Sequence, residues 1–366
     1  MQRAQLRTSS PLLPGVRRRP YALAVLALAL AAVGACGEDT VTIGPNENDA
    51  GSLGTPSATS PSPSSSTPPP PPSTDGGADA GRDGSATTGP SKYDTNGTHA
   101  FASTVVTEGG TSTVVVAPTA PGKYPVVSLS PGLQQPATAY AGYAARLASH
   151  GIITVMRNDG GVLTGTAAVE SAITGIVTTW LPAENARAGS PIQGKVDLTK
   201  VGLAGHSRGG KASLLAAENG LKGKIAGWFG LDPVDATAFG DNVKARDKLA
   251  TVGVPIAMIG AEVASSCSPA ADTFAALYAA SVSPSVLVKG KGAGHTQLED
   301  PATCAACGLC TPAGTADGKV VLAYAIRYLT AFFARELLGD TSVGPSFAGA
   351  GAASDISLGR VEITAK

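Results

Sequence analysis

The sequence predicts one α/β domain with a mostly parallel central sheet and helices on both of its faces. Two observations lead to this fold. Short, continuously apolar segments, typical of strands buried on both faces, alternate with longer segments of helical character. A G-x-S-x-G pentapeptide at residues 205–209 lies at one junction between a strand and a helix. Residues 92–339 are enough for one large core of this kind.

The first predicted element is a hairpin, in which residues 104–106 and 113–116 flank a Gly-Gly turn. Strands and helices then alternate, and a last short strand is expected within residues 355–364. The strands are expected at 125–130, 152–156, 200–206, 225–231, 255–260 and 285–289, and the helices at 137–149, 166–181, 209–219, 270–280 and 320–338.

Ser207 is the centre of the pentapeptide and has Gly205 and Gly209 on its two sides. The apolar residues before it predict a buried strand, and residues 211–218 predict a helix. In this context the motif forms a nucleophile elbow, a tight turn in which side chains at the glycine positions would clash. Ser207 is therefore the predicted nucleophile, and a plain Gly-rich loop is the alternative.

A serine of this kind needs a histidine base that follows it in the chain. Of the four histidines, His99 and His150 precede the serine. His206 is its neighbour, and neighbouring side chains in a sharp turn are expected to point apart. His295 remains, at the end of a Gly-rich segment, 289–294, which is predicted to be a mobile loop. It is the predicted base, and a surface histidine that caps the next segment is the alternative.

Three carboxylates are candidates for the acid that orients this base. Asp232 follows the strand at 225–231, and Pro233 ends that strand and fixes its direction. Glu262 follows the next predicted strand. In folds of this type, the end of that strand is the commoner place for the acid. Asp235 is the third candidate. A purely structural role, a carboxylate bound to loop amides, is the alternative for Asp232.

An oxyanion hole requires two backbone N–H groups. Arg208, the residue after the nucleophile, is expected to provide one. The second is expected from Leu133, because Gly132 lets the loop after the strand at 125–130 turn its amides inward. A simple Pro-Gly turn is the alternative for this loop. The Arg208 side chain is expected to brace the elbow by pairing with a carboxylate, with recognition of an anionic substrate as the alternative.

The cleft is predicted to be open, with little or no lid. Only 22 residues separate Asp232 from Pro255, which is too few for a helical cap domain. An open cleft suits short acyl groups and bulky or polymer-embedded esters. Four aromatic residues are expected in the core, with a place in the pocket lining as the alternative: Tyr140, Tyr143, Trp180 and Trp228.

These motifs resemble those of α/β-hydrolases of the chlorophyllase-like and polyester-hydrolase-like, or cutinase-like, branch. The segments GHSRGGK at 205–211 and GLDPVD at 230–235 are similar to chlorophyllase sequences. Lipases of the pancreatic type also carry their triad acid in a Gly-Leu-Asp-Pro corner, so the resemblance implies that Asp232 rather than Glu262 is the acid. Pro131 and Gly132 resemble the oxyanion loop of cutinases, where chlorophyllases usually have His-Gly. This difference concerns the substrate rather than the hydrolase chemistry.

Four cysteines belong to the predicted domain, and three of them follow His295 closely. Export to an oxidising compartment favours disulfides, which would connect the segment after one strand to the segment that follows the base. A zinc or iron–sulfur site and free thiols are the alternatives. The four are Cys267, Cys304, Cys307 and Cys310.

Residues 1–35 combine a basic start with a short apolar stretch and are predicted to be a signal peptide. Their end resembles a bacterial lipobox, which implies cleavage before Cys36 and lipidation of its thiol. An ordinary secretory signal with an unrelated cysteine is the alternative. The expected location is outside the cytoplasm, anchored by lipid to a bacterial membrane, either the outer membrane or the cell surface.

Residues 36–91 are rich in Pro, Ser and Gly and are predicted to be a disordered tether. Residues 340–366 are a Gly/Ala-rich tail. Once the five arginines of the leader are removed, 22 basic residues face 27 acidic ones, so no nucleic-acid partner is expected. The protein is expected to be a monomer that acts on a small or polymeric ester.

The predicted activity is two-step acyl transfer through an acyl-enzyme, without a metal or other cofactor. Chlorophyllase-like or lipase activity, an acyltransferase and a small-amide hydrolase are alternatives from the same chemistry. A non-catalytic surface lipoprotein that keeps the fold for binding is the alternative from another class.

Overall fold

The computed structural model describes residues 90–158, 164–236, 243–304 and 308–366. The predicted leader at 1–35, Cys36, nearly all of the tether at 36–91, and Cys307 lie outside these residues. Within the described part of the chain, no helix is both long and apolar enough to cross a membrane.

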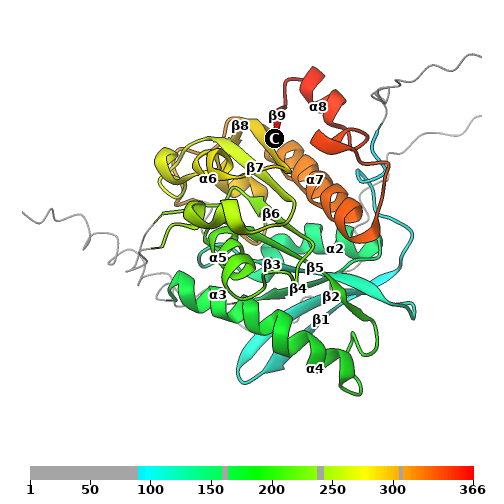
Figure 1. Cartoon of the computed structure of the whole chain (residues 1–366). Helices are drawn as coiled ribbons and strands as arrows, with labels where there is room; N and C mark the ends of the chain where they lie inside the picture. The colour runs from blue at the N-terminus through cyan, green and yellow to red at the C-terminus, as the bar shows by residue number, and fades with distance from the viewer. Residues whose placement is uncertain (1–89, 159–163, 237–242, 305–307) are drawn as a thin grey trace, which may run out of the picture. The chain divides into compact units, whose positions relative to one another are not determined.

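Nine strands form one sheet in the order β1-β2-β4-β3-β5-β6-β7-β8-β9 (Figure 1). The six strands from β4 to β8 in this order pair in parallel, and β1, β2 and β9 join the two edges in antiparallel pairing. This architecture confirms the predicted fold class. The strands are β1 Phe101–Glu108, β2 Thr111–Pro118, β3 Tyr124–Ser130, β4 Ile153–Arg157, β5 Val196–His206, β6 Gly227–Leu231, β7 Ile256–Val263, β8 Ser285–Gly294 and β9 Val361–Ala365.

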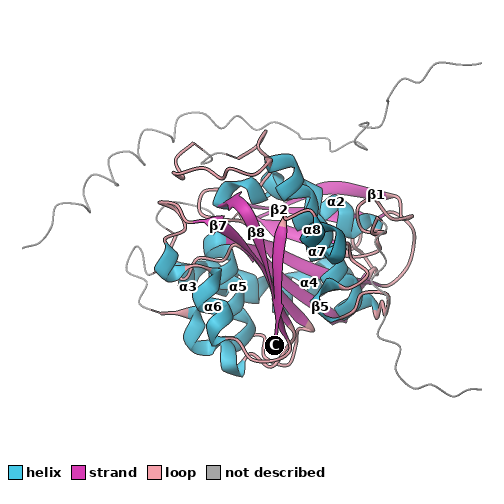
Figure 2. Cartoon of the chain, turned by 90° about the horizontal axis from the view of Figure 1, so that it is seen from above, coloured by secondary structure: helices cyan, strands magenta, loops and turns pink. Residues whose placement is uncertain are grey.

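Helices cover both faces of the sheet (Figure 2). The helices α2 and α7 pack on one face, and α3, α5 and α6 pack on the other. The α-helices are α2 Ala141–Ser149, α3 Thr166–Gly175, α4 Leu181–Ala186, α5 Ser207–Asn219, α6 Phe274–Ala280, α7 Gly318–Leu338 and α8 Ala352–Ser357. Short helical turns are η2 Ala137–Tyr140, η3 Ile176–Trp180, η4 Ala245–Thr251, η5 Ala270–Asp272, η6 His295–Leu298 and η7 Pro345–Phe347.

Aromatic side chains contribute to the core on both faces. On the α7 side, Phe332 packs against Phe229 of β6 with 5.6 Å between ring centroids. On the α5 side, Trp228 is fully buried, and its indole N–H donates a hydrogen bond of 2.8 Å to Ser213 Oγ. Burial of this kind supplies most of the favourable free energy of folding and fixes the strand ends in space.

The structure corrects two boundaries near the C-terminus. Residues 289–294, predicted as a loop, continue β8, because Lys289 and Gly290 pair with both neighbouring strands and Gly294 pairs with Val263. The expected last strand is β9, whereas residues 355–357 belong to α8. Since β9 forms one edge of the sheet, the Gly/Ala-rich tail contributes directly to the fold.

Candidate active site

The G-x-S-x-G segment forms the predicted sharp turn between β5 and α5. Ser207 is the first residue of α5 and has a φ of 53°, in the left-handed region that non-glycine residues rarely adopt. A Cβ atom at Gly205 would collide with the backbone of Gly209, and one at Gly209 would collide with the carbonyl oxygens of Ser130 and Pro131. Packing around the turn therefore requires glycine at both positions.

Asp232 follows β6 directly and is fully buried. Its Oδ2 atom lies 2.6 Å from His295 Nδ1, a hydrogen-bond distance. Its Oδ1 atom accepts a bond of 3.0 Å from the backbone N–H of Ala261. Its φ of 35° also lies in the left-handed region. Ser207 and Asp232 are thus both held in strained backbone conformations, which concentrate at functional sites.

The other two candidate acids lie elsewhere. Glu262 is exposed and accepts hydrogen bonds of 2.7 Å from Lys291 Nζ and 2.8 Å from the backbone N–H of Gly292. These two bonds lower the pKa of Glu262. Asp235 is buried but accepts from the backbone N–H of Ala245 and from Arg246 Nε, at 2.6 and 2.8 Å. Of the three carboxylates, Asp232 is the one that the structure brings to His295.

His295 is the first residue of η6 and is almost fully buried. Its imidazole ring lies against that of His206, with 4.6 Å between the ring centroids and 32° between the planes. Because His206 directly precedes Ser207, this contact places the His295 ring beside the elbow.

The predicted oxyanion loop also lies beside the elbow. The backbone N–H of Gly132 donates a bond of 3.0 Å to the Tyr140 hydroxyl. The next N–H, that of Leu133, makes no hydrogen bond within the described residues. Arg208 lies in the first turn of α5, where backbone N–H groups point out of the helix end. Its side chain donates a bond of 2.6 Å to the Thr164 carbonyl, and the expected pairing with a carboxylate stays a prediction.

Three of the four buried polar residues at this site, His206, Ser268 and Glu299, were not predicted to take part in it, and Tyr140 was expected in the core or in the pocket lining. They have no shared sequence pattern, although each is a polar group in an otherwise apolar surrounding, and such groups need partners. Burial, and then the Glu299 carboxylate, raise the pKa of Tyr140 well above its usual value, so the hydroxyl keeps its proton. The four are Tyr140, His206, Ser268 and Glu299.

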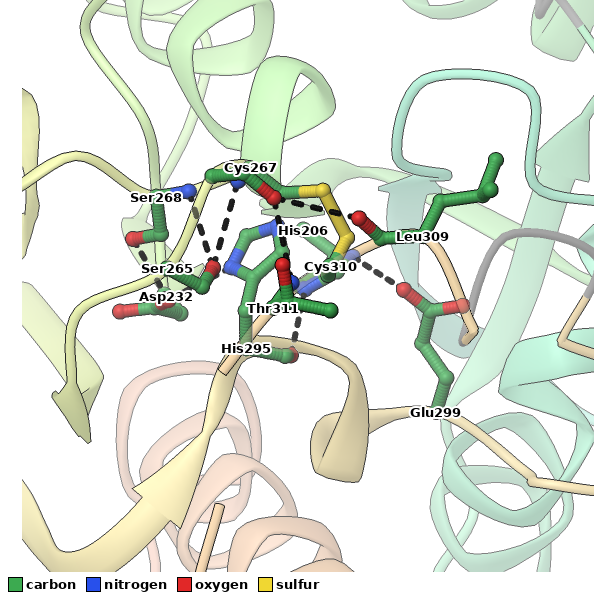
Figure 3. The surroundings of a disulfide bond; sticks show 11 residues. His206, Asp232, Ser265, Cys267, Ser268, His295, Glu299, Leu309, Cys310 and Thr311 are labelled. Atoms are coloured by element: carbon green, nitrogen blue, oxygen red, sulfur yellow. Dashed lines mark hydrogen bonds and ion pairs between the residues drawn. A yellow bond between two sulfur atoms is a disulfide. The ribbon is translucent and has the colours of Figure 1, made fainter. Parts of the chain in front are cut away.

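The Cys267–Cys310 disulfide connects the segment after β7 to the segment after His295, which confirms the expected linkage (Figure 3). Ser268, the residue after Cys267, donates a bond of 3.0 Å from Oγ to Asp232 Oδ2. Cys304 is also disulfide-bonded. The Cys267–Cys310 disulfide therefore anchors the turn in which Ser268 contacts the buried Asp232 carboxylate.

Two further features describe the surroundings. The described residues between β6 and β7 form one helical element, η4. This element is too short for a cap domain. Among the described residues, no group of three or more His, Cys, Asp or Glu side chains is placed to hold a metal ion.

This strand order, with a strained serine at the turn from β5 to α5, defines the class of protein as an α/β-hydrolase. A family model described as Chlorophyllase matches residues 86–320, more than half of the chain. The chain belongs to the chlorophyllase family, a family of the α/β-hydrolase superfamily. In a comparison with curated proteins, none matches the chain.

Proposed function

We propose that this chain is a serine carboxylic-ester hydrolase in which Ser207, Asp232 and His295 form the catalytic triad. The observation that carries the proposal is the 2.6 Å contact between Asp232 Oδ2 and His295 Nδ1, beside a serine with a positive φ. Membership of the chlorophyllase family supports hydrolase chemistry independently of that geometry.

The contact with Asp232 fixes the protonation of the base. An ionised carboxylate only accepts hydrogen bonds, so His295 Nδ1 carries the proton and Nε2 keeps its lone pair. In the first step His295 Nε2 takes the Ser207 proton as Oγ attacks the ester carbonyl carbon. The imidazolium that forms is stabilised by the Asp232 carboxylate, and it then protonates the departing alcohol.

The acyl-enzyme is resolved by water. His295 takes a proton from the water molecule as its oxygen attacks the acyl carbon, and then gives this proton to Ser207 Oγ as the carbon–Oγ bond breaks and the acid is released. In both steps the N–H groups of Leu133 and Arg208 are proposed to stabilise the oxyanion. The absence of a hydrogen bond to Leu133 N–H among the described residues supports its part in this role.

The proposed substrates are esters with short acyl chains or with bulky or polymeric alcohol parts. The small number of residues between β6 and β7, which suits an open cleft, supports this choice. Chlorophyll, which the family name suggests, is a competing substrate, and the Pro131-Gly132 loop favours the simpler esters.

The proposed location is outside the cytoplasm, with a lipid on Cys36 and residues 37–91 as the tether. The sequence at 33–36 supports this proposal. Mass spectrometry of the membrane fraction tests it: a lipidated N-terminal peptide that begins at Cys36 supports the anchor. An unmodified N-terminus elsewhere would overturn it.

Hydrolysis of p-nitrophenyl esters from acetate to palmitate tests the function. We expect activity that falls with acyl length, no activity in Ser207→Ala, and a loss of about 10⁴-fold in kcat for Asp232→Asn. Glu262→Gln is the matched control, because it removes a carboxylate near the end of the neighbouring strand β7, and it should retain wild-type activity.

Each other outcome has a defined meaning. Wild-type activity in Asp232→Asn together with loss in Glu262→Gln would move the acid to Glu262. A folded wild-type protein that hydrolyses none of the esters would overturn the proposal and favour a binding function. Transfer of the acyl group to an added alcohol in preference to water would identify an acyltransferase.

A further inference from the structure

Three buried side chains meet between the oxyanion loop and the base, and we call them the His206 bridge: Tyr140, His206 and Glu299. Each of these residues is at most 1% exposed. His206 Nδ1 lies 2.9 Å from the Tyr140 hydroxyl and 3.0 Å from Glu299 Oε1. His206 Nε2 lies 3.2 Å from the backbone carbonyl oxygen of His295. Figure 3 shows His206 between His295 and Glu299.

The partners of the His206 ring determine where its protons lie. A carbonyl oxygen only accepts, so Nε2 is protonated and donates to His295. Two lone pairs 3.0 Å apart would repel, so a proton also lies between Nδ1 and Glu299 Oε1, whichever atom holds it. In either arrangement the pair carries no net charge. A neutral pair agrees with the burial of both His206 and Glu299. It also agrees with the lack of a hydrogen-bond partner for Glu299 Oε2 among the described residues.

The His206 bridge connects the oxyanion loop to the segment that carries the base. The reaction requires both in fixed positions relative to Ser207. On one side, the Tyr140 hydroxyl accepts a hydrogen bond from the Gly132 N–H and thereby fixes the Pro131–Gly132 peptide, one residue before the Leu133 N–H. On the other side, His206 Nε2 holds the backbone of His295. A Cβ atom at Gly132 would lie 2.8 Å from His206 Nδ1, so the loop approaches the ring as closely as glycine allows.

We propose that the His206 bridge positions the oxyanion loop and the base relative to Ser207, which makes Tyr140, His206 and Glu299 positioning residues for the acyl-transfer reaction. The inference rests on the proposed function. His206 is covalently joined to Ser207, so one imidazole ring links the nucleophile, the oxyanion loop and the base. The bridge acts on alignment, which affects the turnover step rather than the binding of a small ester.

Steady-state kinetics with p-nitrophenyl acetate test this proposal in the full protein. We expect Tyr140→Phe and His206→Gln each to lower kcat by about 10- to 100-fold, with KM changed by less than about 2-fold. Glu299→Leu should lower kcat similarly, whereas Glu299→Gln should retain most of the activity, because its amide N–H can still bond to Nδ1.

Tyr143→Phe is the matched control. Tyr143 lies in the adjoining helix α2, is equally buried, and donates one hydrogen bond of 2.8 Å, to the Leu298 carbonyl. Within the described residues it makes no hydrogen bond to His206, so Tyr143→Phe should lower thermal stability as much as Tyr140→Phe does and leave kcat near the wild-type value. The Tyr140→Phe/His206→Gln double variant should lose no more kcat than the worse single variant, because both changes break one bridge.

The failures of the two proposals are distinguishable. An inactive wild-type protein, or an active Ser207→Ala variant, would overturn the proposed function. A wild-type protein that needs Ser207, with Tyr140→Phe and Glu299→Leu retaining at least half of its kcat, would overturn the His206 bridge alone. So would additive losses in the double variant. If Tyr140→Phe does not fold by circular dichroism, Glu299→Leu against Glu299→Gln gives the same test.

Discussion

Ser268 Oγ donates a hydrogen bond of 3.0 Å to Asp232 Oδ2, the same oxygen that lies 2.6 Å from His295 Nδ1. Both Ser268 and Asp232 are buried. Two donors on one oxygen, and the Ala261 N–H on the other, hold the carboxylate in a single orientation. The carboxylate is thereby oriented before any substrate binds.

Ser268→Ala should lower kcat/KM by about 10-fold, because a hydrogen bond to a buried charged group contributes on the order of 1.5 kcal/mol. The measurement is ester hydrolysis with the triad intact. Ser357→Ala is the control, since Ser357 is exposed and its hydroxyl bonds only to the Ser354 carbonyl within the described residues. Equal activity in the two variants would show that Ser268 does not orient the acid.

The Cys267–Cys310 disulfide should contribute both stability and activity. The two cysteines are 43 residues apart, and closing a loop of that length stabilises the folded state by about 4 kcal/mol in the chain-entropy model. The Cys267→Ala/Cys310→Ala variant should therefore unfold at lower urea concentration. Its kcat should also fall, because Ser268 loses its anchor. A change in unfolding free energy of less than about 1 kcal/mol would contradict this account.

Gly209→Ala should destabilise the elbow by about 3 kcal/mol, because the new methyl group meets backbone oxygens of Ser130 and Pro131 that have no room to move. Gly175→Ala is the matched control. Gly175 is helical, and a Cβ there meets nothing within 4 Å, so alanine should raise the unfolding free energy by about 0.5–1 kcal/mol. Urea denaturation measures both. Equal stabilities for the two variants would exclude the steric account of the elbow.

Asp340 should make stability depend on pH in the acid range. Burial acts to raise its pKa, but hydrogen bonds from Lys92, Tyr93 and Ser342 outweigh burial and hold the pKa well below its usual value. A folded-state pKa below the unfolded value, about 3.9, means that the stabilisation is present above about pH 4 and is lost as the pH falls through the folded-state pKa.

Asp340→Asn should therefore have a lower Tm than wild type at pH 7, and the difference should shrink progressively below about pH 4. Asp247→Asn is the control, because the exposed Asp247 carboxylate makes no hydrogen bond or ion pair among the described residues. A Tm difference for Asp340→Asn that stays constant from pH 7 to pH 2 would refute the assignment.

Much of the fold followed from the alternation of apolar strands and helical segments, because buried parallel strands have few polar positions. The extension of β8 through residues 289–294 could not be predicted in this way. Its glycines carry no side chains that would show a two-residue period, and pairing with β7 and β9 determines its conformation. The position of β9 likewise depends on a distant partner.

Ser207 and His295 could be named from the sequence because chain order and the small number of histidines restrict the choice, whereas the preference for Asp232 over Glu262 depended on the resemblance of the Gly-Leu-Asp-Pro corner to related enzymes. The His206 bridge could not be named in this way. Its three members are far apart in the chain, and only the folded sheet brings Tyr140 and Glu299 to the same ring nitrogen. The expectation that neighbouring side chains in a sharp turn point apart concerns only His206 and Ser207. It does not predict the contacts of His206 with Tyr140 and Glu299, which come from other parts of the chain.

Covalent labelling of the nucleophile tests the central claim most directly. The purified protein is incubated with a p-nitrophenyl phosphonate, which transfers its phosphorus group to an activated serine, and the adduct is located by peptide mass spectrometry. The account predicts one adduct per chain, on Ser207, with stoichiometric release of p-nitrophenol and no adduct in Ser207→Ala. No adduct on the folded wild-type protein, or an adduct on another serine, would contradict it.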